Sequence, residues 1–301
     1  MKVAVLGQGS IGRRHTGILR DLGCEVTTFD PVAGGGAATE DAALAGADAA
    51  VVASPSSEHE RQALAAIAEG VPVLVEKPLA LTAEGAARVQ GAAELAGVPV
   101  DVAMNLRHHP GVLGARDALG EVGRIVRASA WCGSWLPGWR PGTDYRDSYS
   151  ARRALGGGVL LDAIHEIDYV LLLLGPWRQV AGMTAHASSL EIDVEDVALV
   201  HIEHESGALS SIALDYLDRE YHRGCRIVGE EGTIDWDWTR ATVRVTGPEG
   251  LRSERPAPAD VAPTYLAQME RFLGVARGDR EPLVGAAGGR SALEVVDAVR
   301  A

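Results

Sequence analysis

Three glycines with a fixed spacing constrain the fold of this 301-residue chain more than any other feature. Gly7, Gly9 and Gly12 follow directly after the apolar run 3–6 and open a segment with helical spacing. A strand, a glycine-rich turn and a helix in this order are typical of the first unit of a dinucleotide-binding domain. Gly7 suits the tight turn, Gly9 lets backbone amides approach a pyrophosphate, and Gly12 permits close packing of helix and strand.

The other residues of this segment extend the prediction to a nucleotide cofactor. Gln8, Ser10 and Ile11 complete the turn and the start of the helix, whose N-terminal amides attract phosphate. Asp30 follows the second apolar run about 20 residues later, where a carboxylate accepts hydrogen bonds from adenosine ribose hydroxyls. The same carboxylate repels a 2′-phosphate, so the sequence favours NAD over NADP, although a nearby arginine sometimes accommodates that phosphate.

Short apolar runs alternate with alanine-rich helical segments through the first hundred residues, which predicts an α/β Rossmann domain with a parallel, doubly wound sheet, residues 1–118. The expected strands are 2–6, 25–29, 49–53, 71–75 and 99–103, and the expected crossover helices are 11–22, 58–69 and 83–96. The Ser-Pro-Ser-Ser stretch from Ser54 is expected to cap the second of these helices.

After about Pro110 the sequence pattern changes to longer runs of alternating apolar and polar residues with more tryptophan. This pattern predicts an α+β domain, residues 119–301, with a large, mostly antiparallel open sheet. The expected strands are 125–134, 180–187, 197–205, 208–217, 223–229 and 241–245, and the expected helices are 159–174, 264–277 and 290–300. The stretch 248–263, rich in proline and charge, is expected to be a surface connection.

Composition excludes several classes of protein. With 28 basic and 41 acidic side chains the formal charge is −13, which disfavours a nucleic-acid partner. The apolar runs, such as 170–174, are far shorter than the roughly 18 residues of a membrane span. The chain enters a strand pattern at once, so we expect a cytoplasmic protein without a secretion signal. Cys24, Cys132 and Cys225 are far apart and odd in number, which predicts neither disulfides nor a cysteine metal site.

A charged pair ends the apolar run 73–75 at the sheet edge where open α/β sheets bind ligands. Glu76 and Lys77 are expected to face the cofactor there, and Pro78 would hold Lys77 through a cis peptide bond. Lysine at this point can donate a proton or bond a reacting oxygen. Lys2 and Lys77 are the only lysines, so 26 of the 28 basic residues are arginine. A lysine in a chain that otherwise uses arginine for positive charge suggests that its amine is required at that position. The alternative is a plain surface pair at a strand end.

A second cluster of polar side chains follows the glycines 156–158. Asp162, His165 and Tyr169 are three and four residues apart, so one helix would place them on one face. A histidine beside a carboxylate is a common base for a hydroxyl proton near neutral pH. A capping aspartate and a buried structural histidine would explain the same pattern.

The glycine- and proline-containing segment 131–153 gathers aromatic and arginine side chains, among them Trp139, Arg140, Tyr145 and Arg146. Aromatic faces and guanidinium forks suit a sugar ring with a carboxylate or phosphate, whereas an ordinary packed loop is the alternative. Asn105 and Arg107 follow the fifth strand and are expected to contribute to the same substrate site. His201, Glu203 and Glu205 alternate along one strand, and a solvated or dimer-facing sheet surface explains them better than a metal site.

These segments together resemble the Gfo/Idh/MocA family, the relatives of glucose-fructose oxidoreductase and inositol dehydrogenase. The resemblance covers almost the whole chain, and it is carried by GQGSIG, ASPSSEH, LVEKPLALT, NLRHHP, GGGVLLDAIHEIDY and the segment 265–273. It implies a Rossmann domain, an α/β domain whose open sheet forms a homodimer or homotetramer, and NAD(P)-dependent hydride transfer to or from a sugar, cyclitol or sugar derivative.

By this resemblance Lys77 is the catalytic lysine and His165 exchanges a proton with the substrate, while Ser54, Pro55, His59 and Glu76 join the cofactor site. Many members carry an aspartate four residues before that histidine, whereas this chain has Leu161 there and the acid is Asp162. Three alternatives stay open: a relative that retains NAD for redox-assisted glycoside cleavage, a reductase of imine or bilin-like substrates, and a nucleotide-sensing protein without chemistry.

Overall fold

A computed structural model describes all residues, 1–301, and groups them into two compact units. The first unit holds Met1–Asn105 and Ala262–Glu294, and the second holds Leu106–Val261 and Val295–Ala301. The predicted division at residue 118 does not anticipate that residues 262–294 return to the first unit. Long-range packing of this kind leaves no local signal in the sequence.

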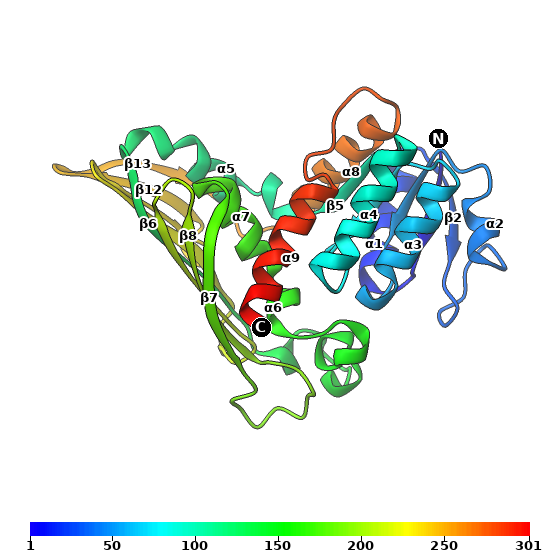
Figure 1. The fold of residues 1–301 in the computed structure, drawn as a ribbon, viewed down its shortest axis with the longest axis horizontal. Helices are drawn as coiled ribbons and strands as arrows, with labels where there is room; N and C mark the ends of the chain where they lie inside the picture. The colour runs from blue at the N-terminus through cyan, green and yellow to red at the C-terminus, as the bar shows by residue number, and fades with distance from the viewer. The chain divides into compact units, whose positions relative to one another are not determined.

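The first unit is the expected doubly wound domain (Figure 1). Its elements are β1 (Lys2–Leu6), α1 (Ser10–Asp21), β2 (Glu25–Phe29), α2 (Glu40–Leu44), β3 (Ala49–Val52), α3 (Ser56–Ala68), β4 (Val73–Glu76), α4 (Ala83–Ala96), β5 (Val100–Ala103), α8 (Ala262–Ala276) and the start of α9 (Ala286–Arg300). The five strands are all parallel in the order β2-β1-β3-β4-β5, so the winding direction reverses between β1 and β3. Ligands of open α/β sheets bind at this reversal, outside the carboxyl ends of the strands.

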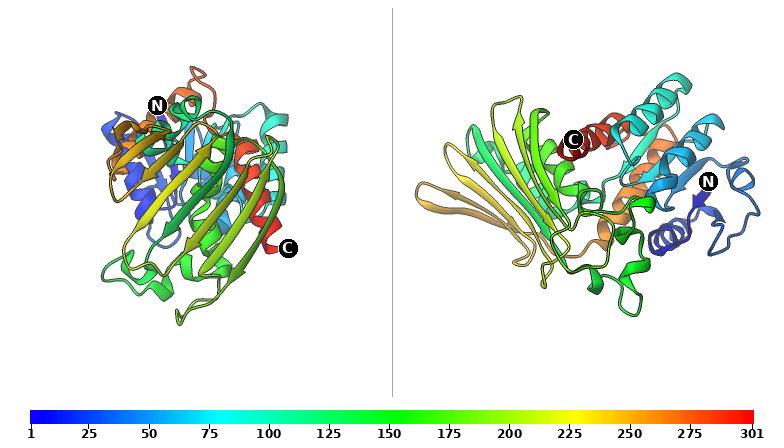
Figure 2. Two further views of the ribbon diagram at one scale, coloured as in Figure 1. Left: turned by 90° about the vertical axis from the view of Figure 1, so that its left-hand side faces the viewer. Right: turned by 60° about the horizontal axis from the view of Figure 1, so that its bottom comes forward.

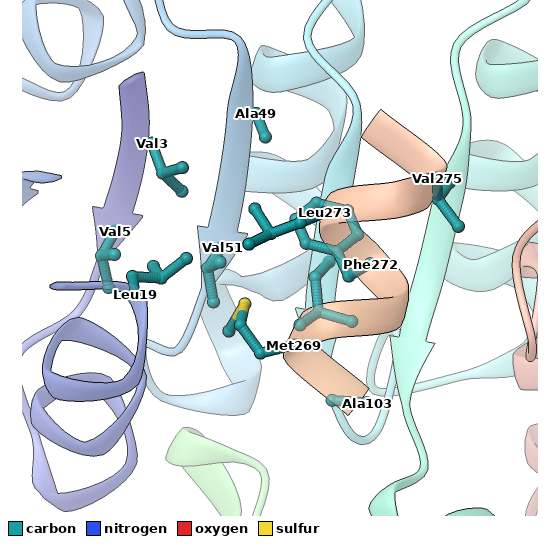
Figure 3. Packing of buried hydrophobic residues seen from close by; sticks show 11 residues of the cluster. Val3, Val5, Leu19, Ala49, Val51, Ala103, Met269, Phe272, Leu273 and Val275 are labelled. Atoms are coloured by element: carbon teal, nitrogen blue, oxygen red, sulfur yellow. The ribbon is translucent and has the colours of Figure 1, made fainter. Parts of the chain in front are cut away.

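One face of this sheet is covered by helices from opposite ends of the chain (Figure 3). Leu19 of α1 and Met269 and Phe272 of α8 pack on Val5 and Val51 of the central strands, and all five are fully buried. The helices α3 and α4 pack together and cover the other face, as right-handed crossovers in opposite directions require. The reversal point is thus held by a core to which the last quarter of the chain contributes.

The second unit is a large open sheet with helices on one face. Its regular elements are α5 (Pro110–Asp117), β6 (Ile125–Gly133), α6 (Val159–Asp162), α7 (Ile164–Leu174), β7 (Trp177–Ala185), β8 (Val197–His204), β9 (Leu209–Asp215), β10 (His222–Gly229), β11 (Thr233–Asp237), β12 (Thr242–Gly247) and β13 (Gly250–Pro256). The order is β13-β12-β11-β10-β6-β9-β8-β7, with every pair antiparallel except β6 and β9 (Figure 2, left).

Short 3₁₀ turns occupy much of the connection between β6 and α6. They are Leu136–Gly138, Tyr145–Asp147, Tyr149–Ala151 and Arg153–Leu155, and two more, Asn105–His108 and Leu119–Glu121, flank α5. Side chains alternate along β8, where Val200 and Ile202 are buried and Leu199 and His201 are exposed. The helices α6 and α7 pack on the buried face, over β6, β8 and β9.

The structure corrects the expectation that 248–263 is a surface connection, because β13 occupies much of it. This strand pairs only with β12 and forms the sheet edge. Charged side chains and a terminal proline, which argued against a strand, are what edge strands commonly carry. Strand β11 and helix α5 were also not predicted.

The expected continuous helix 159–174 is wrong, since it breaks at Ala163 into α6 and α7. No glycine or proline lies at the break, so contacts with the sheet decide it. Asp162 bonds Tyr216 beyond the end of β9, while the Tyr169 hydroxyl donates to the Gly224 carbonyl of β10 at 3.1 Å. The spacing argument therefore holds for His165 and Tyr169, which lie four residues apart in α7, but not for Asp162, which ends α6.

Candidate functional site

The glycine turn of the first unit combines two packed glycines with one open one. Gly7 has a φ of +97°, and a Cβ there would lie 2.5 Å from the Ser54 nitrogen. A Cβ on Gly12 would lie 2.0 Å from the Gly7 carbonyl oxygen, whereas one on Gly9 would meet nothing within 4 Å. Gly7 and Gly12 are thus needed for packing, and the space beside Gly9 is free for a ligand that approaches the backbone.

Helix α1 begins at this turn, and no side chain accepts a hydrogen bond from the backbone amides of its first turn. Its N-cap is Gly9, no side chain caps it, and its first turn contains no acidic residue. Ser10 is exposed and Ile11 half-buried. Unpaired amides and the positive end of the helix dipole at one point form a site for phosphate, which fits the pyrophosphate of a dinucleotide.

The carboxylate of Asp30 ties this turn to the end of β2. One oxygen accepts the Gln8 amide at 2.7 Å, and the other accepts the amides of Val32 and Ala33 at 2.8 and 2.7 Å. Burial raises the pKa of Asp30, but these three hydrogen bonds outweigh it and hold the pKa below its ordinary value. Asp30 therefore stays ionised at physiological pH.

The ends of β3 and β4 lie beside the glycine turn, since the Gly7 backbone abuts Ser54. The Ser54 hydroxyl donates to Gln62 at 2.7 Å, and Pro55 is the N-cap of α3 without a side-chain bond, so the expected serine cap is wrong. His59 is fully buried, with its ring nitrogens 2.7 and 3.0 Å from the carbonyl oxygens of Pro78 and Ser54. Burial lowers the pKa of His59 although the two carbonyl contacts act in the opposite direction, and the ring joins the two strand ends.

Glu76 and Lys77 follow at the carboxyl end of β4. The Lys77–Pro78 peptide bond is cis, which confirms the expectation for Pro78. The imidazole of His15, fully buried in α1, lies 2.7 Å from the Glu76 carboxylate through Nε2. Lys77 is half-buried. A titratable amine thus stands at the sheet edge where the reversal of winding places ligands.

The second unit contains a cavity of about 580 Å³. Three parts of the chain line it: the end of β6 with the loop that follows, the α6–α7 break, and the segment after β9. From these parts come the predicted residues Trp139, Arg140 and Asp162. The volume lies within the range of small-molecule sites, about 300–1,000 Å³.

Asp162 is held in this cavity by tyrosine hydroxyls. Tyr216 donates to its carboxylate at 2.6 Å, and Tyr149 is also hydrogen-bonded to it. Burial, together with the negative charge of Asp162, raises the pKa of both tyrosines well above the ordinary value, so both remain donors. Trp139 packs edge-on against Tyr216 at 5.3 Å between ring centroids. His165 is buried at the start of α7, three residues after Asp162.

Other predicted substrate residues are engaged elsewhere in the structure. Asn105 is buried and donates to the Thr264 hydroxyl at 2.8 Å. Arg107 forms a bidentate pair with Asp168 at 2.9 and 2.8 Å, and burial raises the pKa of that aspartate despite the guanidinium. Arg146 pairs with Asp144 and Glu191 at the surface, and the Tyr145 hydroxyl accepts the Glu191 amide.

Sequence reasoning missed the segment 215–223, which supplies five residues to the cavity. They are Asp215, Tyr216, Arg219, Tyr221 and Arg223. The run Asp-Tyr-Leu-Asp-Arg-Glu-Tyr-His-Arg is rich in charged and aromatic side chains directly after a strand, and this was the signal available.

The structure contains no group of three or more side chains able to hold a metal ion. His201 is exposed on β8, Glu203 pairs with Arg178 at 2.6 Å, and Glu205 lies beyond the strand end. No helix combines the length and apolar character that crossing a membrane requires.

Comparison with known proteins agrees with this architecture. Residues 37–104 match the oxidoreductase family with an NAD-binding Rossmann fold, and residues 115–235 match the Gfo/Idh/MocA C-terminal domain. Inositol 2-dehydrogenase 2 of Saccharopolyspora erythraea is 30% identical over 290 residues, covering 88% of this chain and 80% of that protein. The chain belongs to the Gfo/Idh/MocA family. The resemblance inferred from the motifs is therefore confirmed, and the protein is an NAD-binding oxidoreductase.

One further sequence relative and one solved structure are also similar to this chain. The 1,5-anhydro-D-fructose reductase of Ensifer adhaerens is 29% identical over 245 residues, 78% of this chain and 71% of that protein. The structure of levoglucosan dehydrogenase in complex with NADH superposes with a TM-score of 0.83 at 21% identity, covering 100% of this chain and 96% of that one. At that identity the likeness shows the fold.

Proposed function

We propose that this oxidoreductase transfers a hydride between NAD and a sugar or cyclitol, at a carbon that alternates between alcohol and ketone. The observation that carries the proposal is the cavity of the second unit, where a carboxylate, tyrosine hydroxyls and an indole face line a volume suited to a polyol. The names of relatives, an inositol dehydrogenase and an anhydrofructose reductase, support the same substrate class.

The residues of the glycine turn and Asp30 are assigned to the cofactor. When bound, the nicotinamide supplies the acceptor or donor of hydride at C4. Gly7, Gly9, Gly12 and the first amides of α1 hold the pyrophosphate, and Asp30 accepts the ribose hydroxyls. The open space at Gly9 and the uncapped helix start support the assignment of the pyrophosphate site.

Proton transfer belongs to Lys77 and His165 in this proposal. In the oxidising direction the substrate C–H bond gives up hydride while one of these two side chains takes the hydroxyl proton, leaving a ketone. Asp162 accepts a substrate hydroxyl and orients the ring, since tyrosine hydroxyls keep its carboxylate in place. Glu76, held by His15, positions the neighbouring lysine.

The preference for NAD over NADP is also proposed, and it rests on Asp30. An ionised carboxylate at the end of β2 repels a 2′-phosphate, and the lowered pKa of Asp30 keeps that charge. Initial rates with each cofactor, followed at the reduced-nicotinamide absorbance, test this together with a panel of sugars, cyclitols, sugar acids and nucleotide sugars. We expect turnover with NAD at a higher kcat/KM than with NADP.

Absence of turnover with every compound of the panel would contradict the proposal if NAD is shown to bind. A glycoside-cleavage product without net cofactor reduction would identify the retained-cofactor alternative, and an imine or bilin substrate would identify the reductase alternative. Unchanged ligand binding in Lys77→Met, with no turnover in either protein, would favour a nucleotide-sensing role.

We further propose a cytoplasmic homodimer or homotetramer that assembles through the uncovered face of the large sheet. Met183, Leu199 and Leu209 expose 76%, 46% and 58% of their surface on strands of that sheet. Apolar side chains on an open face are typical of a protein interface. Sedimentation equilibrium should show a dimer or tetramer, and a monomer at micromolar concentration would contradict the assembly.

A further inference from the structure

The arginines that line the cavity of the second unit differ in how their charge is balanced. Arg223 is almost fully buried, and its guanidinium bonds the Glu166 carboxylate at 2.7 Å. Arg140 and Arg219 also line the cavity, but neither forms an ion pair or donates a side-chain hydrogen bond within the chain. Both instead face aromatic rings.

The contact of Arg219 is the closer of the two. Its guanidinium carbon lies 3.5 Å from the centroid of the Trp135 ring, and that of Arg140 lies 5.3 Å from the centroid of Tyr149. A guanidinium stacked on an indole is fixed in orientation while its in-plane N–H groups remain available. Such a fork matches a carboxylate or a phosphate with two parallel hydrogen bonds.

The acids of the cavity do not neutralise these two arginines. Asp162 accepts from Tyr216 at 2.6 Å, and one oxygen of Asp215 accepts the backbone amides of Leu217 and Asp218, both at 2.8 Å. Neither acid forms an ion pair with Arg140 or Arg219, whose guanidinium groups contact the rings of Tyr149 and Trp135. Two positive charges are therefore directed into the cavity of a chain whose formal charge is −13.

We propose that Arg219, stacked on Trp135, and Arg140 bind an oxyanion of the substrate, so that the substrate is a sugar derivative carrying a carboxylate or phosphate. This inference rests on the proposed function, because it assigns the charged group of the substrate that the same cavity binds. The neutral polyol portion faces Asp162 and the tyrosines, and the anionic portion faces the two arginines.

The test compares neutral and anionic sugars on matched rings. For the gluco and galacto series, the free sugar, its uronate and its 6-phosphate are assayed as substrates with NAD, and their binding to the NAD-loaded protein is measured by calorimetry. Wild type should bind and oxidise a uronate or a phosphate with a kcat/KM at least tenfold above that of the neutral sugar. The uronate and phosphate arms distinguish the two sources of the oxyanion.

Variants localise the effect. Arg219→Gln should weaken binding of the anionic sugar about 10- to 100-fold, the range for hydrogen bonds to charged groups, and change the neutral sugar less than twofold. Arg219→Lys should fall between, since it keeps the charge without the fork. Arg240→Gln is the matched control, because Arg240 is an exposed arginine that pairs with Asp237 outside the cavity. The affinity of wild type for the anionic sugar should also fall with added salt, because Arg219 is exposed.

Failure of this inference and failure of the proposed function give different results. NAD reduction with neutral sugars at least as good as their anionic counterparts, or equal losses on both in Arg219→Gln, would overturn the oxyanion site and leave the dehydrogenase intact. Arg219-dependent binding of anionic sugars without NADH formation would support the site and contradict the function. Absence of both binding and reaction in every series would overturn the two together.

Discussion

The glycine turn of the first unit and the cavity of the second are built from different parts of the polypeptide. At the turn, backbone amides, one positive-φ glycine and an uncapped helix start form the site, with Asp30 as its main side chain. In the cavity, side chains from β6, α6 and the segment after β9 converge. A backbone site depends on spacing within a dozen residues, whereas a side-chain site depends on strand order across the whole sheet.

This difference predicts where substitutions act. At the turn, adding atoms should matter more than removing polar groups, because space and backbone direction define the site. In the cavity, removal of a single hydroxyl should matter, because side-chain donors define it.

The largest effect on cofactor affinity is expected at the one open glycine of the turn. Gly9→Val should fold normally, since a Cβ there meets nothing within 4 Å, but its side chain would occupy the space that the dinucleotide needs. We expect NAD affinity to fall more than about tenfold, or 1.4 kcal/mol, in fluorescence titration with NADH. Gly12→Ala is the contrast, because its Cβ would lie 2.0 Å from the Gly7 oxygen and should lower stability by about 1–3 kcal/mol. Equal NADH affinity in Gly9→Val and wild type would contradict the statement that the open space beside Gly9 defines the cofactor site.

The next effect concerns the hydroxyl that holds Asp162. Tyr216→Phe removes a donor 2.6 Å from a buried carboxylate, at a cost of about 1–3 kcal/mol. We expect kcat/KM for the sugar substrate to drop about tenfold, because the carboxylate that orients the substrate loses a hydrogen-bond donor. Tyr169→Phe is matched to it, being buried and bonded only to the Gly224 carbonyl, and should alter stability without lowering kcat/KM. Equal kcat/KM in the two variants would argue against a role of Asp162.

A smaller effect concerns the stability of the protein in acid. Burial lowers the pKa of His109 in the second unit to about 4, from an ordinary 6.5. The unfolded chain then binds a proton that the folded one does not, so stability falls as pH drops from about 6.5 to 4 and levels off below, by at most about 3 kcal/mol. Thermal unfolding at pH 7.5 and 5 should show this slope, and His109→Gln should reduce it, leaving the part that other buried histidines such as His59 contribute. A slope unchanged in the variant would assign the acid sensitivity to other groups.

The smallest effect is expected for a polar side chain at the turn. Ser10 is exposed and does not cap α1. In the proposed site backbone amides bind the pyrophosphate, so Ser10→Ala should change the KM for NAD less than about twofold. A tenfold rise would show that the turn binds through side chains as the cavity does.

The same difference explains how far the sequence could predict the molecule. The five parallel strands, the glycine turn, Asp30 and the cis Lys77–Pro78 bond all follow from local spacing. The contribution of α8 to the first core depends on residues more than 200 positions apart, such as Val51 and Phe272, and no periodicity reveals it.

In the second unit, prediction found part of the cavity and misplaced the rest. Trp139, Arg140 and Asp162 do line it, but Asn105 and Arg107 are engaged by Thr264 and Asp168. A polar residue near a strand end has the same local pattern whether it binds a ligand or an internal partner. Arg219 and Tyr216 were missed because only the sheet order brings their segment beside α6.

We propose that Lys77 moves a proton in NAD-dependent turnover, and one pair of lysine variants tests this role. Lys2 and Lys77 are the only lysines, so Lys2→Met, at an exposed position, is a matched control for Lys77→Met. For each protein, NAD affinity is measured by titration and turnover by initial rates on the same substrate. We expect Lys77→Met to bind NAD like wild type but to lose roughly 100-fold or more in kcat, the contribution typical of a general acid or base, while Lys2→Met is unchanged. Turnover of Lys77→Met at the wild-type rate would contradict it.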